Sequence, residues 1–109
     1  DTDAISTLLY EGADVNEADS EGSTALHWAV YSGYYDAAAL LLENGADANT
    51  VDIYDATPLI SAVFAEDVEM VKLLLEYGAD ANYIDASGYT AYDYALDYEN
   101  AELQELLGP

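Results

Sequence analysis

The chain has 109 residues with 23 Asp or Glu against a single Lys or Arg, and its formal net charge is −22. The length suits one small domain, and the charge excludes neutralising nucleic-acid phosphates or binding anionic lipids. The absence of cysteine excludes disulfides and thiolate sites, no apolar run approaches about 18 residues, and the start predicts no secretory signal.

Three sequence patterns recur with one period of 33 residues. The motif Gly-Ala-Asp-Val/Ala-Asn starts at positions 12, 45 and 78. A threonine followed closely by apolar residues stands at positions 24, 57 and 90, and a leucine pair at positions 8–9, 41–42 and 74–75. Because the three patterns keep the same phase, they indicate a chain of repeated units.

Each unit is predicted to hold two short helices. Thr24, Thr57 and Thr90 stand where a hydroxyl can accept a hydrogen bond from the first backbone N–H groups of a helix. Pro58 suits the first helical position, where an N–H is not needed. Second helices are predicted over residues 36–44 and 68–77, and the glycine after each leucine run is expected to end them in a left-handed conformation. The polar stretch 46–56 is expected to be an extended turn that joins two units.

The pattern closely resembles the ankyrin repeat. Residues 24–29, Thr-Ala-Leu-His-Trp-Ala, match the family's Thr-Pro-Leu-His-x-Ala, and residues 41–49 match its second-helix ending. The resemblance implies an all-α solenoid of helix-turn-helix units with projecting β-turn fingers. It divides a single domain, 1–109, into a partial repeat (1–18), two full repeats (19–51 and 52–84) and a C-terminal capping repeat (85–109). Because the partial repeat lacks a first helix for Ile5, Leu8 and Leu9, further residues are expected upstream.

Several positions depart from the family pattern. The counterparts of His27 are Ile60 and Asp93, so the hydrogen bond made by the family's histidine is expected only once. Acids also replace glycines: Asp55 stands where the other repeats have glycine at positions 22 and 88, and Glu66 and Glu99 stand where the first has glycine at position 33. A positive φ at Asp55 or Glu66 would cost roughly 1 kcal/mol each. A strict consensus design would not contain these residues.

The chain offers little for catalysis or metal binding. His27 is the sole candidate base, and its place in the repeat motif favours a structural hydrogen bond to the neighbouring turn over a catalytic triad. Each Asp-x-Asn step mimics the start of a calcium loop, but the fifth positions are Ala18, Val51 and Ile84, which cannot ligate. These aspartates are therefore interpreted as turn formers. No cofactor, metal site or enzymatic activity is predicted.

Aromatic residues carry the functional prediction. In the ankyrin family, partners bind the concave face formed by the fingertips and the outer side of each first helix. The resemblance places a cluster of apolar and aromatic candidates there: Trp28, Tyr31, Ile53, Tyr54, Phe64, Tyr89, Tyr94 and Tyr98. Such a cluster ringed by acids is typical of a protein-binding patch. Glu21, Asp55, Glu66 and Asp97 are expected to form a rim that faces Lys or Arg of the partner.

Not every tyrosine is assigned to binding. Tyr92 is expected to fill a core position, Tyr35 to fill the junction of a helix pair, and Tyr10, Tyr77 and Tyr83 to be surface residues. The acids at positions 14, 47 and 80 and at 19, 52 and 85 recur in phase and are interpreted as structural. The remaining acids serve either to steer association with a basic partner or to keep the chain soluble.

The sequence therefore predicts a non-catalytic protein-binding module whose partner is a folded protein with a basic or mixed surface, and neither a nucleic acid nor a membrane. The alternative is an acidic mimic of nucleic acid that occupies a nucleic-acid-binding protein. A third alternative is a repeat scaffold whose aromatics only fill gaps. Abundant Tyr, Ser, Asp and Ala with almost no Lys or Arg favour an engineered or resurfaced interface; a natural chain is expected in the cytoplasm.

Overall fold

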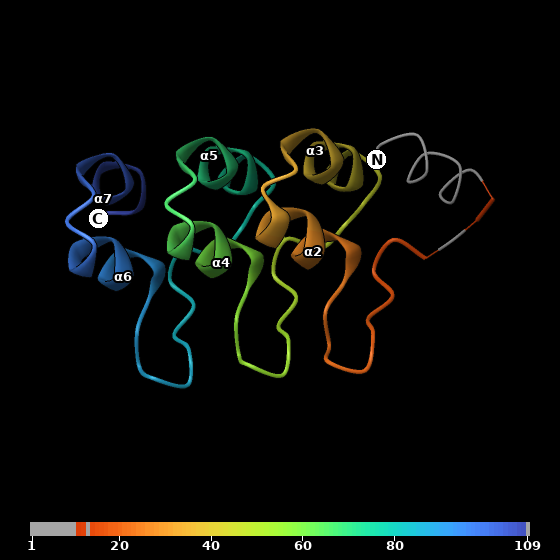
Figure 1. The fold of residues 1–109 in the computed structure, drawn as a ribbon, viewed down its shortest axis with the longest axis horizontal. Helices are drawn as coiled ribbons and strands as arrows, with labels where there is room; N and C mark the ends of the chain where they lie inside the picture. The colour runs from red at the N-terminus through yellow and green to blue at the C-terminus, as the bar shows by residue number, and fades with distance from the viewer. Residues whose placement is uncertain (1–10, 13, 109) are drawn as a thin grey trace.

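The computed structural model describes residues 11, 12 and 14–108. Within them the chain forms helices and no strand, as the all-α prediction requires. The six helices are α2 (Ala25–Ser32), α3 (Tyr35–Glu43), α4 (Pro58–Phe64), α5 (Val68–Glu76), α6 (Ala91–Asp97) and α7 (Ala101–Leu107). Figure 1 shows them in two rows: α2, α4 and α6 form one row, α3, α5 and α7 the other, and finger-like loops extend beyond the first row. None of these helices is long and apolar enough to cross a membrane.

Threonine caps begin each helix of the first row, as predicted. The hydroxyls of Thr24, Thr57 and Thr90 accept a hydrogen bond from the backbone N–H three residues later, at 3.4, 3.3 and 3.2 Å. In α2 and α6 the bond is reciprocated: His27 and Asp93 accept from the N–H of their capping threonine. Asp93 thus keeps the capping half of the histidine's role in the last repeat.

The second-row helices end at glycines in the left-handed region. After α3, Gly45 has φ +94°; its N–H donates to the Leu42 carbonyl at 3.2 Å, and the Ala46 N–H donates to the Leu41 carbonyl at 3.0 Å. The same pair of bonds closes α5 at Gly78. This motif satisfies the last helical carbonyls. The helices end one residue before the predicted bounds because the residue ahead of each glycine is the cap, and α3 begins one residue earlier than predicted.

The core lies between the two rows. Leu26, Leu59, Met70, Leu74 and Leu103 are completely or almost completely buried there. Tyr92 is half-buried against this core, in the position expected for it. The interpretation of Tyr35 as a junction filler is wrong: 43% of its surface is exposed, and the buried residues of α3 are Ala37, Ala38, Leu41 and Leu42.

Aspartates and asparagines build the connections between repeats. In each finger one carboxylate oxygen accepts two backbone N–H groups; for Asp52 these belong to Tyr54 and Ala56, at 2.9 and 3.1 Å. Asp47 likewise accepts from the Asn49 N–H at 2.8 Å. These local turns confirm the aspartates as turn formers. The Asn49 amide also reaches the next repeat, where it donates to the Gly78 carbonyl at 3.1 Å and accepts from the Asp80 N–H at 2.7 Å.

Candidate functional site

Four large rings stand in solvent on the first-row side of the molecule. Trp28 and Tyr31 come from α2, Phe64 ends α4, and Tyr54 lies in the finger that precedes α4. Their exposed fractions are 54%, 77%, 49% and 72% in that order. Solvent alone does not favour such exposure of neighbouring aromatic side chains.

The four rings surround two adjoining hollows between α2, α4 and the finger tips. The first, of about 290 Å³, is lined by Trp28 and Glu21 among others, and the second, of about 360 Å³, by Phe64 and Ala65. Both hollows share four lining residues: Tyr31, Asp52, Tyr54 and Ser61. The structure therefore brings four of the predicted aromatic residues together around one continuous depression.

Two further predicted residues extend this aromatic surface toward the C-terminal end. The rings of Phe64 and Tyr94 meet edge to face with centroids 4.8 Å apart. Tyr89 lies beside Tyr94 at 5.1 Å. Such contacts order aromatic side chains beyond the effect of simple burial. We call the six residues Trp28, Tyr31, Tyr54, Phe64, Tyr89 and Tyr94 the aromatic face.

Three other predicted residues, Ile53, Asp97 and Tyr98, lie outside the hollows. Ile53 is 61% exposed at a fingertip, where its backbone N–H donates to the Glu21 carbonyl of the preceding finger at 2.9 Å. Asp97 and Tyr98 are exposed at the end of α6, and neither lines the hollows. Glu21, by contrast, lines the first hollow and accepts a hydrogen bond from the Tyr54 hydroxyl at 3.1 Å. This bond raises the pKa of Tyr54 above its ordinary value.

A second feature of the face is a finger aspartate that faces a first-helix residue nine positions later. In the first described repeat, the Asp19 Oδ2 accepts the indole N–H of Trp28 at 3.4 Å. In the last, the Asp85 Oδ2 accepts the Tyr94 hydroxyl. Backbone N–H groups of Ser23 and Glu21 lower the pKa of Asp19. Burial opposes a similar shift at Asp85, but the Tyr94 and backbone hydrogen bonds outweigh it and lower that pKa too.

Sequence reasoning missed this pairing, although its signal is visible as an Asp followed nine residues later by an aromatic side chain with a donor. In the middle repeat the pair is Asp52 and Ser61. Asp52 uses Oδ1 for its turn, and its Oδ2 has no hydrogen-bond partner within the part of the chain that the structure describes. Ser61 is too short to repeat the contact, and both hollows lie against this pair.

Comparison with known proteins shows the family to which the chain belongs. A family model described as "Ankyrin repeats (many copies)" matches residues 1–42, 26–75 and 65–107, which together span nearly the whole chain. The chain belongs to the ankyrin-repeat family. A search of curated proteins finds no match. Ankyrin repeats generally serve as protein-binding modules, and proteins built from them are typically non-catalytic scaffolds.

His27 has the structural role expected of it in the ankyrin motif. Its Nδ1 accepts the Thr24 N–H at 3.1 Å, so its Nε2 is the donor to the Ala56 carbonyl of the next finger, at 3.3 Å. Although His27 lines the first hollow, both of its ring nitrogens are already hydrogen-bonded: Nδ1 within the cap of α2, and Nε2 to the finger of the next repeat. In the described ranges, no group of three His, Cys, Asp or Glu residues is placed to hold a metal ion.

Two members of the predicted acidic rim also form hydrogen bonds with residues far away in the sequence. Asp55, at φ 60°, accepts the Tyr83 hydroxyl, which raises the pKa of Tyr83 to about 12. Glu66, at φ 52°, accepts the Asn100 side-chain amide at 3.1 Å. Neither residue lines the hollows. The interpretation of Tyr83 as a plain surface residue is wrong, because its ring is half-buried against the core and its hydroxyl holds the segment after α5 to the finger that precedes α4.

Proposed function

We propose that this ankyrin-repeat chain is a non-catalytic binding module that holds a folded partner protein on its aromatic face. The observation that carries the proposal is the gathering of four exposed rings around one continuous depression. Tyrosine and tryptophan provide large contact areas at low cost in conformational entropy, and they are common where binding energy concentrates. The Phe64–Tyr94–Tyr89 contacts order part of this surface before a partner arrives.

The charge of the face favours a partner with a basic or mixed surface. Glu21 and Asp52 line the depression, and the whole chain carries a net charge of −22. A partner with a basic or mixed surface would be drawn toward it at a rate that falls with added salt. An engineered or resurfaced origin, and a cytoplasmic location for a natural chain, stay predictions from the sequence.

The experiment is partner capture followed by hydrogen-exchange footprinting and alanine variants. Tyr54→Ala and Phe64→Ala should each weaken binding by about 2 kcal/mol or more, as central aromatic contacts do. Tyr77→Ala is the matched control, because Tyr77 is comparably exposed at the end of α5 in the other helix row. If every alanine variant of the aromatic face stays within about 0.5 kcal/mol of the native affinity, the proposal is wrong.

The same series tests the nucleic-acid mimic, which the charge of −22 favours. A mimic's affinity would decline with each acid removed and would collapse in high salt. Removing rings from the aromatic face would then have little effect. A partner that normally binds DNA or RNA and shows this pattern would replace the proposed function.

A further inference from the structure

The middle repeat differs from its two neighbours at the pairing of finger and first helix. In the outer repeats an aromatic donor from the helix, Trp28 or Tyr94, reaches Oδ2 of the finger aspartate. In the middle repeat the helix offers Ser61, and Oδ2 of Asp52 has no partner among the residues described. Space accompanies this acceptor, because Asp52 and Ser61 line both hollows.

The walls of this space favour a cation. Glu21 and Asp52 contribute two carboxylates, and neither Lys nor Arg is among the lining residues. Trp28, Tyr31 and Tyr54 add rings whose faces attract a positive charge. His27 lines the same space, but its two nitrogens are already occupied by Thr24 and Ala56.

We propose that the hollow over Ser61 is the site that receives an arginine side chain of the partner, whose guanidinium donates to Asp52 Oδ2 and stacks against the surrounding rings. Arginine fits better than lysine because its planar guanidinium stacks on aromatic faces and offers several N–H donors to two carboxylates at once. This inference rests on the proposed function: it names the group by which the partner is recognised.

A short peptide isolates this contact from the rest of an interface. The probe is acetyl-Gly-Arg-Gly amide, added to the native chain at about 0.15 M salt, where long-range attraction to the net charge is screened. Trp28 is the only tryptophan and lines the hollow, so its fluorescence reports binding there. The arginine peptide should give a saturable change, and the uncharged citrulline peptide should bind at least about tenfold more weakly.

Two other peptides test competing occupants. A tyrosine peptide offers the kind of donor that the outer repeats supply themselves, and a lysine peptide offers charge without the planar fork. Both should bind more weakly than the arginine peptide. Equal binding by the citrulline or the tyrosine peptide would overturn the proposal.

Ser61→Tyr is the decisive variant, because it gives the middle repeat the residue that its neighbour has at Tyr94. The new ring should fill the hollow, donate to Asp52 and weaken the arginine peptide at least about tenfold. Ser61→Ala leaves the hollow open and should change the affinity less than about twofold. Thermal unfolding of both variants confirms that they fold. A folded Ser61→Tyr variant that binds as the native chain does would refute the assignment.

Two variants that each remove one negative charge distinguish binding in the hollow from attraction to the net charge of the whole chain. Glu21→Gln removes a carboxylate from the hollow, whereas Glu102→Gln removes one from α7 in the other row. Glu21→Gln should weaken the arginine peptide clearly more than Glu102→Gln, and equal losses would contradict the proposal.

A captured partner distinguishes the two conclusions. If it footprints on the aromatic face and its affinity is unchanged by Ser61→Tyr, this inference fails and the proposed function stands. If it footprints on α3, α5 and α7, the proposed function fails.

Discussion

Two turns that join the helices of a repeat differ in backbone strain and in capping: the turn between α2 and α3, and the turn between α4 and α5. Each needs a residue in the left-handed region followed by a helix cap. Gly33 takes the first role at φ +75° with no Cβ in the way, but Tyr34 after it provides no side-chain cap for α3. In the second turn Glu66 takes φ 52° with a full side chain, and Asp67 then caps α5.

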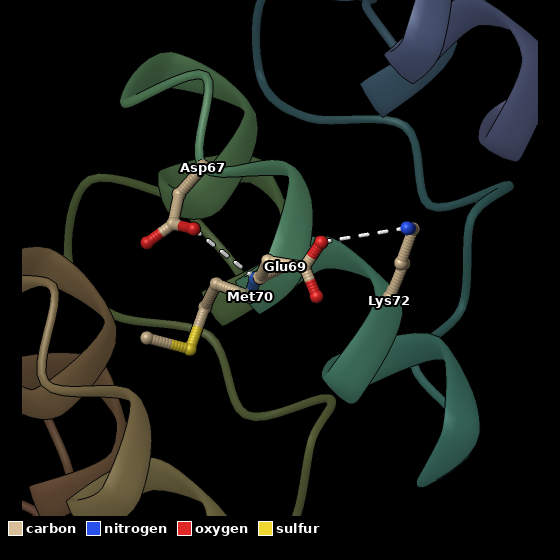
Figure 2. Close-up of polar contacts among 4 residues, drawn as sticks. All are labelled: Asp67, Glu69, Met70 and Lys72. Carbon is tan, nitrogen blue, oxygen red and sulfur yellow. Dashed lines mark hydrogen bonds and ion pairs between the residues drawn. The ribbon is translucent and has the colours of Figure 1, made fainter.

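Figure 2 shows the side-chain cap that follows the second turn. The Asp67 carboxylate faces the backbone nitrogen of Met70, which donates to it at 3.2 Å. Glu66 also reaches Asn100 of the next repeat at 3.1 Å. The first turn instead keeps a relaxed backbone and exposes the ring of Tyr34. The first turn therefore lacks a side-chain cap, and the second has a strained backbone. The strained turn is the one that forms a hydrogen bond with the next repeat.

The largest expected effect comes from imposing the second turn's strain on the first. Gly33→Glu should lower the free energy of unfolding by about 1–2 kcal/mol, the cost of a left-handed non-glycine residue. Urea unfolding monitored by circular dichroism measures it. Ser32→Glu adds the same charge at an exposed neighbouring position and should cost clearly less. Equal losses would show that the effect is charge repulsion rather than backbone strain.

A smaller effect is expected from giving the first turn the cap that it lacks. Tyr34→Asn places at α3 the residue type that caps α7 at Asn100, and it should raise the free energy of unfolding by about 1 kcal/mol. Tyr34→Ala removes the ring without adding a cap and serves as the control. The same urea titration applies, and a gain no larger than that of the alanine variant would contradict the prediction.

The last effect appears at alkaline pH and concerns Asp55, another acid in the left-handed region. Its bond from Tyr83, like the bond from Tyr94 to Asp85, raises the tyrosine pKa to about 12, against an ordinary value of about 10. The folded state therefore holds these protons more tightly than the unfolded state. Their contribution to stability is complete below about pH 10 and is lost as the pH rises to about 12.

Stability measured across that range tests the two bonds. Between about pH 9 and pH 12, the unfolding midpoint of the native chain should fall more than that of Tyr83→Phe, and more again than that of a Tyr83→Phe, Tyr94→Phe double variant. Tyr77→Phe, at a half-exposed tyrosine that ends α5, should follow the native profile. Parallel profiles for all four proteins would show that the hydrogen bonds do not persist in solution.

Local features of this fold were predictable because each depends on residues within one turn of chain. The threonine caps, the left-handed glycines after the leucine runs and the aspartate turns all join atoms two to five residues apart. The positive φ values of Asp55 and Glu66 followed from the phase of the repeat, since glycine occupies the equivalent positions elsewhere.

Contacts between residues far apart in the sequence were less predictable. The Tyr83–Asp55 and Asn100–Glu66 bonds join residues 28 and 34 positions apart. The sequence favours a surface position for Tyr83 and a rim position for Asp55 and Glu66. The gathering of Trp28, Tyr31, Tyr54 and Phe64 followed from the family resemblance. The serine at position 61 is visible in the sequence, but its consequence is not, because the unpartnered Oδ2 of Asp52 is recognised only when the same atom of the three finger aspartates is compared.

The chain has one lysine, Lys72, and its position has a practical consequence. Figure 2 shows it on α5 beside Glu69, with Nζ to Oε1 at 3.4 Å, and its side chain remains about half exposed. It belongs to the helix row that lines neither hollow. A sensor surface coupled through this amine would therefore hold the molecule by the row of α3, α5 and α7, and the hollow over Ser61 would face the analyte.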